Sequence, residues 1–520
     1  MKKIRFLLTF FVFFVFVSCA NASTPWVNNL RNMFINNVAV IYTINIRSFG
    51  AVDYNKNDII ELELGEVSGT FSNAAPKLKK LASMGINTIY LLPVTKTGKL
   101  KALGTAGSLY AMDSFDALNP QLLDKTDLVP DIKTQAKNFI KEAHKNGLHV
   151  IVDLPSCGSY DMSLEKPDLF LKDKDGAAIV PADWTDVRLF RVYNDDKTLN
   201  RNLVDEYKKF INLMQELGVD GIRADVAAIK PQEFWKEIID YARDKDPQFL
   251  FLAEASSKWT NPAKGYVTYT SVEDLLKAGF DGFYSEWSNL KEIKNSSDFH
   301  KKIQDDMKIL EQFEGQKSMI ANFATHDQTS PVVMGGYPYW QMVNWLNMTL
   351  PLNPYILDGF PYADPYIYKY ENKKADKSYT DDDTYFVHRG KFDIFNFSRP
   401  PLNDIPNSLH KKEFDDSIRS RYLLLGMIST KEIEPLKTDN SNVFAFRKQN
   451  GNESLVVVGN LDIKSDQKVK VKIPKFSADD FVMPVKMQEA PLAKKGSLTM
   501  VLKPYEIQVY AIKKITKIKK

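Results

Sequence analysis

The sequence predicts an α/β protein, a (β/α)₈ TIM barrel with a subdomain inserted after its third strand and a C-terminal antiparallel β-sandwich domain. Two observations predict this fold. From about residue 38, short apolar runs alternate with amphipathic helical stretches, and eight such units follow one another. After about residue 427, short strands with alternating polarity replace them.

The eight predicted barrel strands are apolar on both faces, as parallel strands covered by helices must be. They are expected at residues 38–46, 86–92, 149–154, 221–225, 249–254, 282–285, 319–324 and 355–359. Helices are expected at residues 75–84, 133–146, 203–217, 231–244, 271–278, 299–313, 339–346 and 416–427. Eight units favour a closed barrel, and the lack of a Gly-rich phosphate loop after the first strand weighs against a dinucleotide fold.

The domain boundaries follow from changes in this pattern. We expect the barrel at residues 38–154 and 199–427, interrupted at 155–198 by a segment too long for a simple loop. The β-sandwich is expected at 428–515, with strands at 443–448, 455–460, 468–473, 497–502 and 506–512.

Composition excludes several classes of protein. The chain has 520 residues, of which 44% are hydrophobic and 26% charged, so a packed globular protein is expected. The formal net charge is +4, and no Lys/Arg cluster is interleaved with aromatic residues, which argues against a nucleic-acid partner. Cys19 and Cys157 are the two cysteines, so no disulfide framework is expected.

The N-terminus predicts export. Basic residues precede an apolar run at 6–17, which has the form of a signal-peptide core within a leader at 1–22. Ser18-Cys19 resembles a lipoprotein processing site, after which Cys19 would carry lipid, whereas Ala20 to Ala22 offers an ordinary cleavage site. We therefore expect a periplasmic or extracellular protein and favour a membrane anchor through Cys19.

Polar residues close the predicted barrel strands at the carboxyl face, where barrel enzymes carry their chemistry. Arg223 and Asp225 close the fourth strand two residues apart, so both face the barrel mouth. Glu254 ends an apolar fifth strand, a setting that raises a carboxyl pKa and suits a general acid. His326 and Asp327 follow the seventh strand. Each motif alone is more typical of an ion pair, a helix cap or a turn, but three acids on nearby strands of one barrel indicate a catalytic site.

These motifs resemble the signature regions of the α-amylase family, glycoside hydrolase family 13. The resemblance is carried by Gly221–Asp225, Glu254, Phe323–Asp327, Asp153 in Val152-Asp153-Leu154-Pro155, Tyr110 in Gly107–Asp113, and Leu502–Glu506. It implies a retaining mechanism in which Asp225 is the nucleophile and Glu254 is the acid and then the base. It further implies that Asp327, Arg223, His326, Tyr110 and Asp153 bind or orient the sugar. The carboxyl groups of Asp225 and Glu254 are then expected about 5 to 5.5 Å apart.

Two departures from the family pattern bear on the substrate. Cys157 and Gly158 stand where relatives carry Asn and His, and Ala228 and Ile229 stand where they carry Lys and His. We expect a hydrolase of maltodextrin-like or starch-like glucans that differs from an ordinary endo-amylase. The alternatives are a surface glycan-binding lipoprotein with little catalysis and an α-glucan transglycosidase. No organic cofactor is expected.

A loop after the first strand predicts a structural calcium site. Oxygen donors recur at every second position and end in a carboxylate, as in loops that bind hard cations. The predicted ligands are Asp53, Asn55, Asn57, Ile59 and Glu61. An ordinary polar turn is the alternative.

Overall fold

The computed structural model describes residues 26–52, 54, 60–102, 108–181, 184–365, 409–477, 479–486, 488 and 490–514. An eight-stranded parallel sheet in the order β10-β1-β2-β3-β6-β7-β8-β9 forms its centre. A bridge between Ile320 and Asn353 brings the two outer strands together, so the barrel is nearly closed. The strands are β1 (Ile41–Ile44), β2 (Thr88–Leu91), β3 (His149–Leu154), β6 (Gly221–Ala224), β7 (Leu250–Ala253), β8 (Gly282–Ser285), β9 (Ser318–Ala321) and β10 (Tyr355–Leu357).

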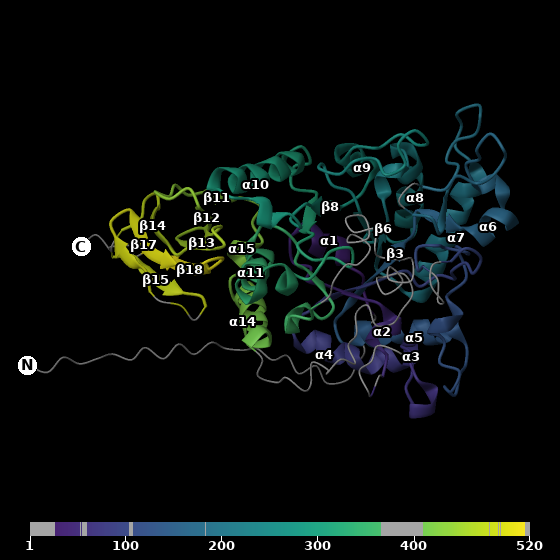
Figure 1. Cartoon of the computed structure of the whole chain (residues 1–520), viewed down its shortest axis with the longest axis horizontal. Coiled ribbons are helices and arrows are strands. Elements are labelled where there is room, and N and C mark those ends of the chain that lie inside the picture. The colour runs from purple at the N-terminus through teal and green to yellow at the C-terminus, as the bar shows by residue number, and fades with distance from the viewer. Residues whose placement is uncertain are drawn as a thin grey trace, which may run out of the picture.

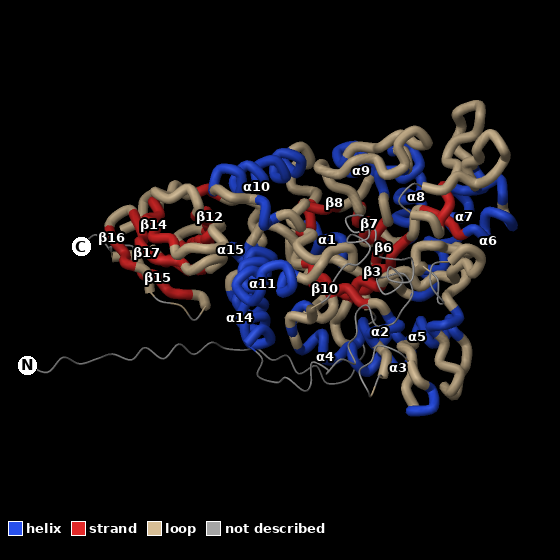
Figure 2. The backbone as a smooth tube through the Cα atoms, viewed as in Figure 1, coloured by secondary structure: helices blue, strands red, loops and turns tan. Residues whose placement is uncertain are grey.

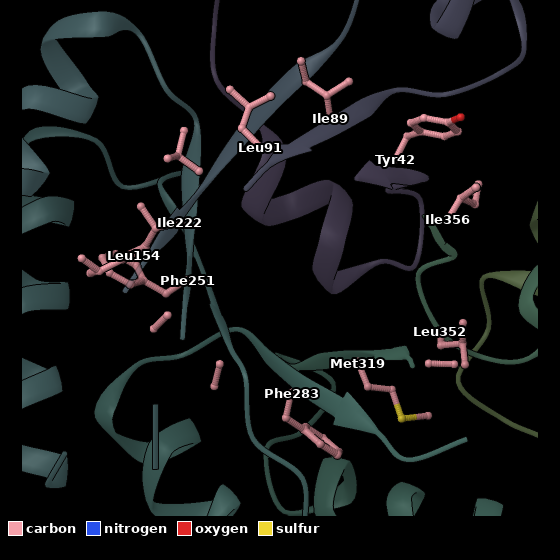
Figure 3. Packing of buried hydrophobic residues seen from close by; sticks show 14 of the residues in the cluster. Tyr42, Ile89, Leu91, Leu154, Ile222, Phe251, Phe283, Met319, Leu352 and Ile356 are labelled. Carbon is pink, nitrogen blue, oxygen red and sulfur yellow. The ribbon is translucent and has the colours of Figure 1, made fainter. Parts of the chain in front are cut away.

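The barrel strands are buried on both faces, and side chains alternate between two cores. Ile41, Leu252 and Ile320 fill the barrel interior. Their neighbours Tyr42 and Ile89 belong to the larger core that lies between the strands and the helices (Figure 3). Burial of each aliphatic side chain contributes about 1.5–3 kcal/mol to the stability of the fold. Because both faces of every barrel strand are buried, apolar residues are favoured at successive positions, and each strand appears in the sequence as a continuous apolar run.

Helices surround the strands (Figure 2). Their ends carry the expected signals: the Asn200 side chain accepts a hydrogen bond from the backbone N–H of Leu203, and Gly218 ends the same helix at φ 93°. The helices are α1 (Leu30–Ile35), α2 (Ile46–Phe49), α3 (Phe71–Ala74), α4 (Leu78–Ser83), α5 (Ile132–Lys145), α6 (Tyr160–Glu165), α7 (Arg201–Leu217), α8 (Gln232–Lys245), α9 (Val272–Ala278), α10 (Ser296–Glu311), α11 (Pro331–Thr349), α14 (Leu409–Leu423) and α15 (Leu425–Ile428).

The C-terminal part packs two antiparallel sheets face to face. Their shared core joins Val443 and Val456 of the five-stranded sheet to Val471 and Leu498 of the three-stranded sheet. Phe299 on α10 stacks on Phe444 with ring centroids 3.8 Å apart, which fixes this domain against the barrel. Helix α10 accordingly lies beside the C-terminal sheets (Figure 1). The strands are β11 (Glu434–Pro435), β12 (Val443–Asn450), β13 (Glu453–Asn460), β14 (Gln467–Lys472), β15 (Phe481–Pro484), β16 (Leu492–Lys494), β17 (Ser497–Leu502) and β18 (Ile507–Lys513).

The inserted segment after β3 contains an antiparallel pair, β4 (Cys157–Ser159) and β5 (Val187–Leu189). The predicted fold class is therefore confirmed: a parallel barrel, an insertion after its third strand and a C-terminal antiparallel sheet domain. The predicted leader at residues 1–22, including Cys19, lies outside the described residues. Within the part of the chain that the structure describes, no helix combines the length and hydropathy needed to cross a membrane.

Candidate active site

Two neighbouring strands deliver the first pair of acids. Arg223 lies in β6 opposite Asp153 in β3, and Asp225 and Glu254 follow directly after β6 and β7. Parallel register aligns the ends of these strands, because Ala224 pairs with both Leu154 and Ala253. The sheet therefore presents the acids side by side at its carboxyl edge.

The Arg223 guanidinium joins three carboxylates. Its Nη1 atom lies 2.9 Å from Asp153 Oδ1 and 3.0 Å from Asp225 Oδ1, and its Nη2 atom lies 2.6 Å from Glu254 Oε1. Its Nε atom donates to the Tyr284 hydroxyl at 3.3 Å. Because the guanidinium is planar and 99% buried, it holds Asp225 and Glu254 in one fixed arrangement.

Glu254 has the environment of a general acid. Burial raises its pKa well above the ordinary value, against the lowering effect of the Arg223 charge. Its second oxygen accepts a hydrogen bond from the backbone N–H of Val226 at 2.7 Å. Val226 has φ 37°, a left-handed conformation that costs a β-branched residue about 1–3 kcal/mol. This strained residue directly after Asp225 aims its N–H at Glu254 and so couples the two acids.

Asp153, Tyr110 and His326 form a network behind these acids. The Tyr110 hydroxyl donates to Asp153 Oδ2 at 2.7 Å and lies 2.7 Å from His326 Nε2. The two rings are parallel, with centroids 5.8 Å apart. Burial lowers the pKa of His326, so the imidazole is neutral at neutral pH. His326 Nε2 also lies 3.4 Å from Asp327 Oδ2, which links the third acid to the network.

The acids meet at one pocket of about 170 Å³. Asp225, Glu254, Asp327 and Tyr110 line it, whereas Asp153, Arg223 and His326 are buried behind its wall. The lining residues are Ser108, Tyr110, Cys157, Trp184, Asp186, Val187, Asp225, Val226, Glu254 and Asp327. The three carboxylates singled out in the sequence are thus brought together, and Arg223 reaches the substrate space only through the carboxylates that it holds.

The lining residues that come from the inserted segment are not among the site residues predicted from the sequence. Trp184, Asp186 and Val187 lie at or just before β5, which folds back over the barrel mouth beside Cys157 of β4. The sequence signal was weak, because the segment is merely rich in acidic and aromatic residues and its pairing is non-local.

Gly158, Ala228 and Ile229, which depart from the family pattern in the sequence, lie in apolar surroundings. A Cβ atom on Gly158 would lie 2.6 Å from the Phe170 ring, so this position faces an aromatic core. Ala228 and Ile229 are buried and are absent from the pocket lining. Positions 158, 228 and 229 therefore contribute no polar side chain to the pocket.

Most of the predicted calcium loop, namely Asp53, Asn55, Asn57 and Ile59, lies outside the described residues. Glu61 is described, and its backbone N–H donates to Glu66 Oε2 at 2.9 Å. Tyr54 donates its N–H to the other oxygen of the same buried carboxylate at 2.8 Å, so Glu66 holds both ends of the loop. Among the described residues, no group of three or more His, Cys, Asp or Glu side chains is arranged to hold a metal ion.

Known proteins resemble different parts of the chain. The family model described as the maltogenic amylase C-terminal domain matches residues 433–509. An α-1,4-glucan:maltose-1-phosphate maltosyltransferase of Mycolicibacterium smegmatis is 31% identical over 241 residues, covering 42% of this chain and 31% of that protein. The α-amylase MalA of Haloarcula japonica is 27% identical over 230 residues, covering 42% of this chain and 29% of that protein. The matched region thus spans less than a third of the length of these relatives.

Solved structures share the fold over nearly the whole chain. The maltogenic α-amylase AmyB of Thermotoga neapolitana superposes with a TM-score of 0.64 at 19% identity and covers 94% of this chain and 100% of that one. The α-amylase of Geobacillus thermoleovorans gives 0.64 at 18% identity and covers 93% and 99%. The resemblance of this chain to the α-amylase family, glycoside hydrolase family 13, is thereby confirmed.

Proposed function

We propose that the protein is a retaining glycoside hydrolase that acts on α-glucosidic bonds of maltodextrin-like or starch-like glucans. One observation carries the proposal. A single buried guanidinium holds Asp225 and Glu254 at the ends of adjacent barrel strands, and both line one pocket with Asp327. Two carboxyl groups that flank one sugar position are what retaining hydrolysis requires.

The roles follow from the environments of the two groups. Glu254, whose pKa burial raises well above the ordinary value, is the acid that donates its proton to the departing glycosidic oxygen. Asp225 is paired with Arg223 and accepts a hydrogen bond from the Ser156 N–H at 3.2 Å, so its carboxylate is oriented to attack the anomeric carbon. Glu254, now ionised, then takes a proton from water that releases the sugar from Asp225. Asp327 is the most exposed of the three acids and is placed to accept hydrogen bonds from ring hydroxyls.

A transglycosidase is the second candidate, because the Mycolicibacterium relative is a maltosyltransferase. The two activities share the glycosyl-enzyme and differ in whether water or a sugar accepts the glycosyl group. A glycan-binding lipoprotein with little catalysis is the third alternative. Chromatography of products from maltoheptaose, with and without an added acceptor, distinguishes all three.

The test of catalysis is Asp225→Asn, with Asp175→Asn as the control. Asp175 is an exposed turn residue of the inserted segment, so its substitution removes the same charge away from the pocket. We expect Asp225→Asn to lower kcat on maltooligosaccharides more than about 10³-fold with an unchanged Tm. Wild-type turnover in Asp225→Asn would refute the assignment.

Two further proposals concern the N-terminus and the loop after β1. Lipidation of Cys19 would anchor an exported protein to a membrane, and mass spectrometry of the N-terminal peptide in wild type and Cys19→Ala tests it. Calcium at residues 53–61 would be structural. Calorimetric titration of calcium into chelator-treated protein tests this site, and the absence of both heat and thermal shift would contradict it.

A further inference from the structure

A fourth carboxylate lines the pocket. Asp186 is contributed by the inserted segment just before β5, so it faces the barrel acids from a different element. It is 98% buried. Burial raises the pKa of the neighbouring Cys157 to about 12, and the charges of Asp225 and Asp186 add to that rise against the effect of Lys230. Asp186 and Asp225 therefore act on the same small volume.

Three cations in the described part of the chain lie near the pocket without lining it. Arg188, two residues after Asp186, interacts with the Asp186 charge and donates hydrogen bonds to the neighbouring Thr185 and Val187 carbonyls. Arg223 contacts three carboxylates, and Lys230 donates to the Ser156 carbonyl at 2.9 Å beneath the end of β3. Burial lowers the pKa of Lys230 to about 8, so it is still largely charged at neutral pH. Among the described residues, no Lys or Arg lines the pocket.

Counted over the described residues, the region consequently keeps a net negative charge when Glu254 is protonated. Four aspartates outnumber three cations, and the buried His326 is neutral; the aspartates are Asp153, Asp186, Asp225 and Asp327, and the cations are Arg188, Arg223 and Lys230. Trp184, Val187 and Val226 form an apolar wall beside these charges. An apolar wall lowers the local dielectric and strengthens repulsion of an anion.

We propose that Asp186 is a specificity-determining residue that restricts this pocket to uncharged sugars and excludes sugar phosphates. The inference rests on the proposed function, since it takes the pocket as the donor site. A phosphate monoester carries a charge of about −1.5 to −2 at neutral pH. Neutral sugar hydroxyls, in contrast, can donate hydrogen bonds to Asp186. The substrate would then be supplied by a reaction that releases unphosphorylated α-glucan chains.

Calorimetric binding of maltose and of maltose 1-phosphate tests the proposal without depending on turnover. In the wild-type protein at low salt we expect maltose 1-phosphate to bind at least about tenfold more weakly than maltose, and we expect the ratio of the two dissociation constants to fall at high salt. Asp186→Asn should lower this ratio by about tenfold, because the amide can still form hydrogen bonds but carries no charge. The control Asp175→Asn should leave the ratio of the two dissociation constants unchanged.

Equal affinity of wild type for the two sugars would overturn the inference, as would binding of neither. The same holds if a folded Asp186→Asn keeps the wild-type ratio. Should Asp186→Asn fail to fold, the salt dependence of the wild-type ratio decides, since a salt-independent ratio contradicts an electrostatic filter. A protein that binds maltose selectively and cleaves no glucan would refute the proposed function alone.

Discussion

Replacement of Arg223 by lysine separates the geometry of the guanidinium from its charge. In the structure one planar group contacts Asp153, Asp225 and Glu254 at 2.9, 3.0 and 2.6 Å. A lysine ammonium is a compact point charge and cannot reproduce the two-sided fork. We expect Arg223→Lys to fold and to lose the fixed relation between nucleophile and acid.

The expected loss follows from the contacts. Hydrogen bonds to charged groups contribute about 1.5–3 kcal/mol, so loss of one catalytic contact should lower kcat/KM about 10-fold to 150-fold. Arg223→Gln additionally leaves buried carboxylates without a cation, which costs about 3–5 kcal/mol of folding stability. The Arg223 charge lowers the pKa of Glu254, so in Arg223→Gln this pKa should rise further and the alkaline limb of the activity profile should move to higher pH.

The assay is kcat/KM on a chromogenic maltooligosaccharide between pH 4 and 10, with thermal denaturation of each variant. Lys208→Met is the matched control, because this cation pairs with Glu237 at 2.8 Å on the outer helices. Wild-type kcat/KM in Arg223→Lys would refute the positioning role. An alkaline limb that stays in place in a folded Arg223→Gln would refute the electrostatic coupling to Glu254.

Three other predictions concern single side chains. Asp358 is buried, and burial raises the pKa of its carboxyl group above the unfolded value near 3.8. Tyr42 donates a hydrogen bond to its Oδ1 at 2.8 Å, and its Oδ2 lacks a hydrogen-bond partner among the described residues. The protonated carboxyl stabilises the fold below the unfolded pKa, and this stabilisation is lost as the pH rises toward the folded pKa, so Asp358→Asn should raise the unfolding free energy by about 1–3 kcal/mol, and by more at higher pH, in urea titrations. A gain that shrinks as the pH rises would contradict this. Cys157 should resist alkylation by iodoacetamide in the folded protein at pH 8, because burial raises the pKa of its thiol to about 12. Rapid alkylation with loss of activity would contradict this and would mean that the thiol is exposed in the pocket wall. Gly158→His should lower stability by about 1–3 kcal/mol without raising kcat, because the Cβ faces Phe170, and a gain in kcat would show that the position reaches the sugar.

The barrel was predictable because its signals are local. Strand β3 (His149–Leu154) and strand β8 (Gly282–Ser285) have the predicted bounds, since each is a short apolar run between helices. Residues 225 and 254 were expected as strand ends and lie one position beyond β6 and β7. Helix α11 begins at Pro331, eight residues before the predicted start, because non-helical Gly335 and Gly336 interrupt its pattern.

The pocket was less predictable because half of its wall depends on long-range pairing. Asp225, Glu254 and Asp327 lie in recognisable sequence motifs, and each follows a barrel strand. Asp186 approaches them only because β5 pairs with β4, and three-residue strands leave almost no periodic signal. The short strands β15 and β16 were missed for the same reason.

Formation of a covalent glycosyl-enzyme on Asp225 is tested by mass spectrometry of the protein after reaction with a fluorinated glucosyl fluoride, which slows release of the bound sugar. We expect one added sugar on the peptide that contains Asp225, and no adduct in Asp225→Asn. An adduct on Asp186 or Asp327, or none in a protein that hydrolyses maltooligosaccharides, would contradict it.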